Sequence, residues 1–185
     1  MYQVVWQRVL FTSFGINIEA VTIVVTAFLA GLGLGSIAGG RVSRRGGATL
    51  LLAFAVVEIS IGLYGFISVP LFRWIANYSA GMSATATGLL TFTLVVIPTF
   101  FMGATLPLLV AYAVSRNVSV GKSVGQLYFS NTAGSALASL MTAAFLMREL
   151  GESNSVAVAA TINVVVGSTV LVMWLAERKK QPVTP

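Results

Sequence analysis

Acidic side chains are few and widely spaced in this chain of 185 residues. The five acids are Glu19, Glu58, Glu149, Glu152 and Glu177, and the sequence contains no Asp, His or Cys. Metal sites need ligands such as Cys or His, catalytic triads need a base such as His, and glycosidase-type dyads need two paired carboxylates. The sequence therefore predicts no catalytic residue, no metal site and no cofactor, and we expect that the chain is not an enzyme.

Glu58 is the one acid in the middle of a long apolar stretch. A charged side chain at the centre of a bilayer costs about 2.5–3.5 kcal/mol on insertion scales, so such a residue normally faces the interior of a helix bundle. Two interpretations remain open for it. Glu58 either binds a proton, a cation or another ligand, or it makes a structural hydrogen bond to a neighbouring helix.

Other polar side chains occur at comparable positions in later apolar stretches, namely Gln126, Tyr128, Asn131 and Asn163. Amides and phenols at this depth either bridge helices or line a polar cavity. The five clear apolar stretches carry no Lys or Arg at mid-span, so Arg8 is the only cation that could reach the acid. We expect a polar cavity formed by Glu58, Gln126, Tyr128, Asn131 and Arg8.

The elements that position these residues are apolar helices. The chain is 57% hydrophobic and 9% charged, whereas soluble domains are about 25% charged. Five stretches reach the length of about 20 residues that a helix needs to cross a bilayer. Residues 72–86 predict a short amphipathic segment on the outer face of the membrane. Residues 1–14 would span only about 21 Å. They predict either half of a helix whose beginning is missing, which gives six spans and is the favoured alternative, or a segment in the interface, which gives five spans with the N-terminus outside. The five clear spans are residues 20–40, 48–70, 87–114, 124–147 and 156–176.

These stretches predict an all-α fold that forms a single domain over residues 1–185. The fold is a polytopic transmembrane bundle of about six helices, of which five are clear and the first is incomplete. Lys and Arg concentrate in loops that alternate to one side of the membrane, and such loops are normally cytoplasmic. We therefore expect a multi-pass membrane protein with its basic loops and C-terminus in the cytoplasm. The cations occur singly between apolar runs, which argues against nucleic-acid binding. The basic loops hold Arg41, Arg44, Arg45, Arg116 and Lys122, and the tail holds Arg178, Lys179 and Lys180.

Small residues recur at every fourth position on two of the predicted helices. The first stripe contains Gly31, Gly35 and Gly39, and the second contains Gly134. In a membrane, small residues let helix backbones approach closely. We expect both stripes to be packing faces, with a sliding transport interface as the alternative.

Three motifs carry a resemblance to a known family. They are Tyr2-x-x-x-Trp6-x-Arg8, Pro98-x-x-x-Met102-Gly-Ala-Thr-Leu-Pro107, and Tyr128-x-x-Asn131-Thr-x-Gly134. In this order, they resemble the membrane portion of bacterial fused major-facilitator/spermidine-synthase-like proteins, in which a Glu matching Glu58 also occurs. The resemblance covers essentially the whole chain. The apolar half-helix that usually precedes the first motif and the cytosolic aminopropyltransferase-like domain are both missing from the sequence.

The resemblance implies half of a major-facilitator fold and a module that moves or hands over a polyamine or a related small metabolite. Such halves normally pair, so it also implies a homodimer or a hetero-oligomer with another membrane protein, besides contact with the lipid bilayer. A separate aminopropyltransferase-like enzyme at the cytoplasmic face is a further implied partner. The alternative function is a non-transporting structural subunit or a membrane anchor for such an enzyme or for a larger complex.

Overall fold

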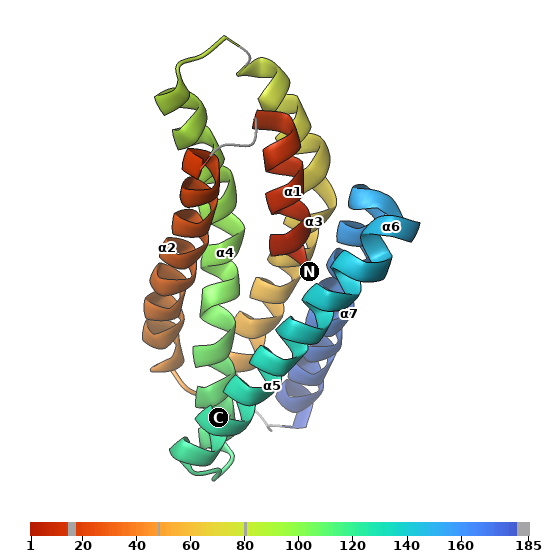
Figure 1. The fold of residues 1–185 in the computed structure, drawn as a ribbon. Coiled ribbons are helices and arrows are strands. Elements are labelled where there is room, and N and C mark those ends of the chain that lie inside the picture. Colours follow the sequence, from red (N-terminus) through yellow and green to blue (C-terminus); the bar gives the residue numbers. More distant parts are fainter. Residues whose placement is uncertain (15–17, 48, 80, 181–185) are drawn as a thin grey trace.

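A computed structural model describes residues 1–14, 18–47, 49–79 and 81–180 of the chain, and every regular element in these ranges is helical. The helices form an elongated bundle (Figure 1). In chain order they are α1 (Tyr2–Phe14), α2 (Ile18–Ser43), α3 (Thr49–Tyr78), α4 (Ala84–Ser115), α5 (Val120–Met141), a π-helical turn η1 (Thr142–Leu146), α6 (Met147–Glu149) and α7 (Gly151–Lys180).

Four of these helices are long and apolar enough to cross a membrane: Val21–Ser43, Thr49–Tyr78, Thr85–Ser115 and Gly151–Lys179. The chain is therefore a multi-pass helical membrane protein. The predicted fifth span at 124–147 is not among these four helices and stays a prediction. Helix α5 contains several Gly and Ser residues and Asn131, which lower its hydropathy. The more apolar residues of the predicted range lie beyond Met141.

Helix α3 is longer than predicted. The expected span 48–70 begins at residue 48, which lies outside the described residues, and α3 continues past Pro70 to Tyr78. The predicted amphipathic segment at 72–86 is therefore wrong, since its first half is the end of α3 and α4 begins at Ala84. Proline interrupts one hydrogen bond of a helix, but membrane helices tolerate this interruption when their neighbours compensate.

Helix α2 packs against α4 along its glycine stripe. A Cβ atom added at Gly31 would lie 1.9 Å from Thr99 Oγ1, and one added at Gly35 would lie 1.9 Å from the carbonyl oxygen of Phe100. At Gly39 the nearest atom, the Ala104 carbonyl oxygen, would be 2.7 Å away. The backbones can approach this closely only because these positions lack side chains. The predicted packing face on α2 is confirmed.

The second predicted stripe behaves differently. A Cβ atom added at Gly134 would meet no atom within 4 Å. Most of α5 is exposed along its length, and Phe129 is 72% exposed. Among the described helices, α5 contacts chiefly α4, near its first turns, and η1. The prediction that Gly134 packs against another helix is wrong for this chain, because α5 leans away from the bundle at that level.

Helix α1 spans only part of the length of the bundle, as expected for residues 1–14, and lies beside α3 with its N-terminus at mid-height (Figure 1). Trp6 is completely buried, and its ring lies near those of four other aromatic residues. The closest is Tyr2, at a centroid distance of 4.9 Å. The aromatic cluster around Trp6 consists of Tyr2, Phe28, Tyr64 and Phe72.

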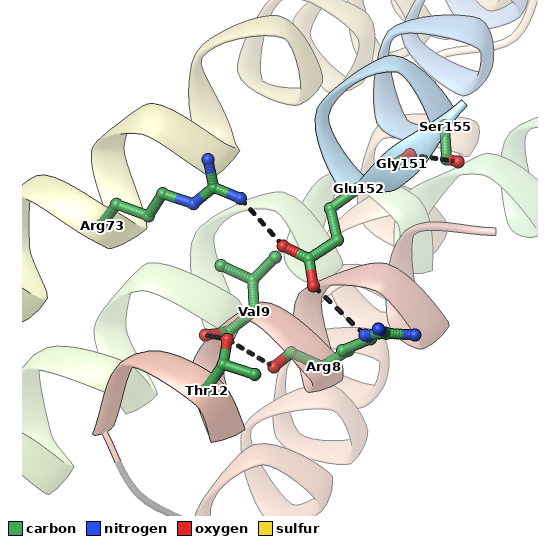
Figure 2. Close-up of polar contacts among 7 residues, drawn as sticks. All are labelled: Arg8, Val9, Thr12, Arg73, Gly151, Glu152 and Ser155. Atoms are coloured by element: carbon green, nitrogen blue, oxygen red, sulfur yellow. Dashed lines mark hydrogen bonds and ion pairs between the residues drawn. The ribbon is translucent and has the colours of Figure 1, made fainter. Parts of the chain in front are cut away.

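An ionic cluster joins α1, α3 and α7 at the upper end of the bundle. Figure 2 shows Glu152 between two arginines. Arg8 Nε lies 3.2 Å from Glu152 Oε1, and Arg73 Nη2 lies 2.9 Å from Glu152 Oε2. Because both guanidinium groups are more than half exposed, these pairs fix the position of α1 more than they add to stability.

The basic segments gather at the opposite end. Figure 1 places the ends of α2, α4 and α7 and the start of α5 together at the lower end of the bundle. There Arg116 pairs with Glu177 and its guanidinium also donates a hydrogen bond to the Tyr112 hydroxyl at 3.0 Å. The Tyr112 hydrogen bond, followed by the charge of Glu177, raises the pKa of Arg116 above its usual value. The cytoplasmic location of this basic end stays a prediction.

Candidate functional site

A cavity of about 610 Å³ lies between α5 and the rest of the bundle. Six helices contribute to its walls: α1, α2, α3, α4, α5 and α7. Ligand-binding cavities usually measure about 300–1,000 Å³, so this one has the volume of a small-molecule site. Its polar lining residues are Tyr2, Gln3, Ser36, Glu58, Thr105, Tyr128, Asn131, Ser135, Ser139 and Asn163.

Glu58 belongs to a hydrogen-bonded chain that crosses three helices. The Asn163 side chain on α7 donates from Nδ2 to Glu58 Oε2 on α3 at 2.6 Å. In turn, the Tyr2 hydroxyl on α1 donates to Asn163 Oδ1 at 3.2 Å. Glu58 therefore makes a structural hydrogen bond to a neighbouring helix and also lines the cavity.

Two glycines allow this pairing because they bring α3 and α7 together. Gly62, one turn after Glu58, faces α7, where an added Cβ would lie 2.6 Å from Val164 Cγ2. Gly167, one turn after Asn163, faces α3, where an added Cβ would lie 2.8 Å from Ile59 Cγ1. The carboxylate and the amide therefore meet between two close backbone contacts, which leave the two helices little freedom to separate.

Helix α5 supplies the opposite wall of the cavity through a single face. Tyr128, Asn131, Ser135 and Ser139 are spaced by three or four residues and all line the cavity. Gln126 does not line it, so that part of the predicted set is wrong. At about 100° per residue, Gln126 points about 160° away from Tyr128 around the helix.

Arg8 is also absent from the cavity lining. It lies about 9 Å further along α1 than Tyr2, taking about 1.5 Å per residue, and it is paired with Glu152 (Figure 2). The expectation that Arg8 belongs to the cavity is therefore wrong. Among the described residues, no Lys or Arg forms an ion pair with Glu58.

The remaining walls are apolar. Phe28 and Leu32 from α2, Ile61 from α3, and Met102 and Leu106 from α4 face the same space. A carboxylate therefore lies at one side of a cavity that also offers apolar surface and several neutral hydrogen-bonding groups. This combination suits an aliphatic molecule that carries a positive charge.

Sequence reasoning identified three of the polar lining residues, Glu58, Tyr128 and Asn131, and it missed others. Tyr2 was noted only as part of a motif, and Ser135 and Ser139 were not singled out. Their positions four and eight residues after Asn131 are the helical spacing of one face, and this signal was present in the sequence. Asn163 was noted as a polar residue, although its pairing with Glu58 was not foreseen.

Comparisons with known proteins gave no match: no family model, no curated protein and no solved structure corresponds to this chain.

Proposed function

We propose that this membrane protein is a transport or hand-over module that binds a small organic cation, such as a polyamine or a related metabolite, in the cavity at Glu58. The observation that carries the proposal is the environment of the Glu58 side chain. It lines a cavity of about 610 Å³, and its one hydrogen-bond partner among the described residues is the neutral amide of Asn163.

A cation would complete this site. An acid within a membrane protein is normally paired, protonated or in contact with water, and no described Lys or Arg forms a pair with Glu58. A cationic ligand would supply the missing charge. The methylene groups of an aliphatic amine would contact the apolar wall at Leu32, Met102 and Leu106.

The family resemblance supports the same proposal. Tyr2 belongs to the first motif, Met102 to the second, and Tyr128 and Asn131 to the third. All four residues line the cavity. Motifs far apart in the sequence therefore converge on one space, as expected for residues that share a function. The family itself, the major-facilitator half-fold and the absence of enzymatic activity stay predictions.

The test is binding of spermidine to the purified protein in nanodiscs, measured by calorimetry, together with its uptake into proteoliposomes. Glu58→Gln should abolish binding and uptake, because it removes the negative charge and keeps the shape of the side chain. Wild-type binding should weaken as the pH falls, since protonation removes the same charge. Glu149→Gln is the matched control, because Glu149 is an exposed acid on α6 that does not line the cavity.

Two results would reject this function. The first is a Glu58→Gln protein that binds spermidine with unchanged affinity and pH dependence. The second is an equal loss of binding in Glu149→Gln, which would indicate a general effect of charge and not a site at Glu58.

A structural role is the second candidate, and the exposure of α5 favours it. Polar residues such as Gln126, Ser130 and Thr132 are exposed on this helix, although lipid cannot hydrogen-bond to them. A protein partner that covers α5 could form hydrogen bonds with these residues. A subunit or membrane anchor of a larger complex would have such a partner. Native mass spectrometry from the source membrane would show the chain bound to an enzyme or to several other subunits if this function is correct, and alone or only as a pair of membrane modules if it is not.

A further inference from the structure

The two carboxylate oxygens of Glu58 have different surroundings. Oε2 accepts the hydrogen bond from Asn163 Nδ2 at 2.6 Å. Oε1 accepts no hydrogen bond within the described part of the chain, and the side chain borders the cavity. A ligand in the cavity therefore finds one carboxylate oxygen open and the other already engaged by the protein.

Tyr2 and Glu58 bind the two ends of the Asn163 amide. A phenol hydroxyl that donates to Oδ1 requires the carbonyl side of the amide to face α1. The NH₂ side then faces α3, where the ionised carboxylate can only accept. Rotation of the amide would break the hydrogen bond to Glu58 Oε2, because the amide oxygen cannot donate to a carboxylate, whereas the Tyr2 hydroxyl could accept from Nδ2 in place of donating to Oδ1.

Tyr2 itself is held in place by its packing. A Cβ atom added at Gly65 would lie 2.8 Å from the Tyr2 hydroxyl oxygen and from its Cε1 atom, so the tyrosine ring fits against α3 only because this position is glycine. The Trp6 ring packs on its other side at a centroid distance of 4.9 Å. The phenol is thus positioned by α1 and α3 together before any ligand arrives.

We propose that Tyr2 and Asn163 are specificity-determining residues, which make the cavity select an ammonium group over a guanidinium group. This inference rests on the proposed function, because it assumes that Glu58 contacts the cation. A guanidinium ion binds a carboxylate best through two parallel hydrogen bonds, one to each oxygen. An ammonium ion is a compact charge that binds well to a single oxygen. Asn163 takes one of the two acceptor positions of Oε2, so a guanidinium that binds both oxygens competes with the amide, whereas an ammonium can bind to Oε1 alone.

The experiment compares two ligands with the same four-carbon chain, 1,4-diaminobutane and 1,4-diguanidinobutane, by calorimetry on the protein in nanodiscs. We expect the wild-type protein to bind the diamine at least about tenfold more tightly, since the guanidinium forfeits one charge-assisted hydrogen bond. Asn163→Ala should free Oε2 and reduce the preference to about threefold or less. Tyr2→Phe, which keeps the ring and removes the hydroxyl, should reduce it by a smaller factor.

Thr161→Ala is the matched control. This residue precedes Asn163 by two positions on α7, it is exposed, and its hydroxyl bonds only to the Ala157 carbonyl of its own helix among the described residues. The ligand preference of this variant should equal that of the wild type. If Asn163→Ala fails to fold, the comparison between Tyr2→Phe and the wild type still decides the question.

The outcomes separate this inference from the function on which it rests. If neither ligand binds, or if Glu58→Gln binds the diamine as well as the wild type does, both proposals fail. If diamine binding depends on Glu58 but the diguanidine binds equally well, only the selectivity inference fails. An unchanged preference in both Asn163→Ala and Tyr2→Phe would overturn it in the same way.

Discussion

The indole Nε1 of Trp6 donates a hydrogen bond to Ser68 Oγ at 2.9 Å, and both residues are completely buried. The serine hydroxyl passes the interaction on by donating to the carbonyl oxygen of Gly65 at 2.8 Å. The short helix α1, whose apolar residues already belong to the main core, is joined by this hydrogen bond to the interior of α3. The tryptophan of the Tyr-x-x-x-Trp-x-Arg motif therefore has a structural role in this chain.

Trp6→Phe should destabilise the protein by about 1–3 kcal/mol, because it removes a buried hydrogen bond and leaves part of the indole volume empty. Ser68→Ala removes the same hydrogen bond without changing the indole, and it should also cost about 1–3 kcal/mol because the buried indole N–H is left without an acceptor. The thermal unfolding midpoint in detergent measures both effects. A Trp6→Phe protein that melts at the wild-type temperature would show that the tryptophan does not anchor α1.

Gly35→Ala should destabilise the α2–α4 contact, because the new methyl group would meet the Phe100 carbonyl oxygen at 1.9 Å. Overpacking of this kind costs about 1–3 kcal/mol and occasionally more. The control is Gly33→Ala on the same helix, where an added Cβ meets nothing within 4 Å. We expect a clearly lower unfolding midpoint for the first variant only. Equal midpoints for the two variants would contradict the observed orientation of α2.

The sequence predicted the helices well because hydropathy and helix length depend on local composition. It also indicated the interior position of Glu58, since the cost of burying an acid is independent of the details of the fold. The face of α2 that packs was readable from Gly31, Gly35 and Gly39, because close backbone contact requires small residues at this spacing.

The remaining features depend on how one helix is rotated and tilted relative to another, and no local pattern encodes that. Gln126 and Tyr128 are near neighbours in sequence, but only Tyr128 lines the cavity. Gly134 lies on a stripe like that of α2, yet α5 leans away and leaves it uncovered. Arg8 was assigned to Glu58 because no other cation lay near it in the predicted spans, but in the structure Arg8 forms an ion pair with Glu152 on α7.

The membrane orientation can be tested with introduced cysteines, because the chain contains none of its own. Arg44, Lys122 and Lys179 follow or belong to elements whose ends meet at the lower end of the bundle (Figure 1). If this basic end is cytoplasmic, Cys at these positions should resist an impermeant thiol reagent in intact cells and react after lysis. Arg148→Cys, at the opposite end, should react in intact cells. External labelling of any two of the three basic positions would reverse the orientation.

Gly134→Ala should stabilise the isolated protein or leave its stability unchanged, the opposite of Gly35→Ala. Gly134 lies inside α5, and a Cβ atom added there would meet nothing within 4 Å. With no steric conflict, the change removes the conformational freedom of a glycine from the unfolded chain, and alanine is favoured in a helix interior by about 0.8–1 kcal/mol. The unfolding midpoint of the purified monomer should therefore rise slightly. The same measurement in native membranes provides the contrast. If Gly134→Ala lowers stability there, a helix of another subunit packs closely on this face of α5, whereas an unchanged or raised stability would show that this face contacts lipid.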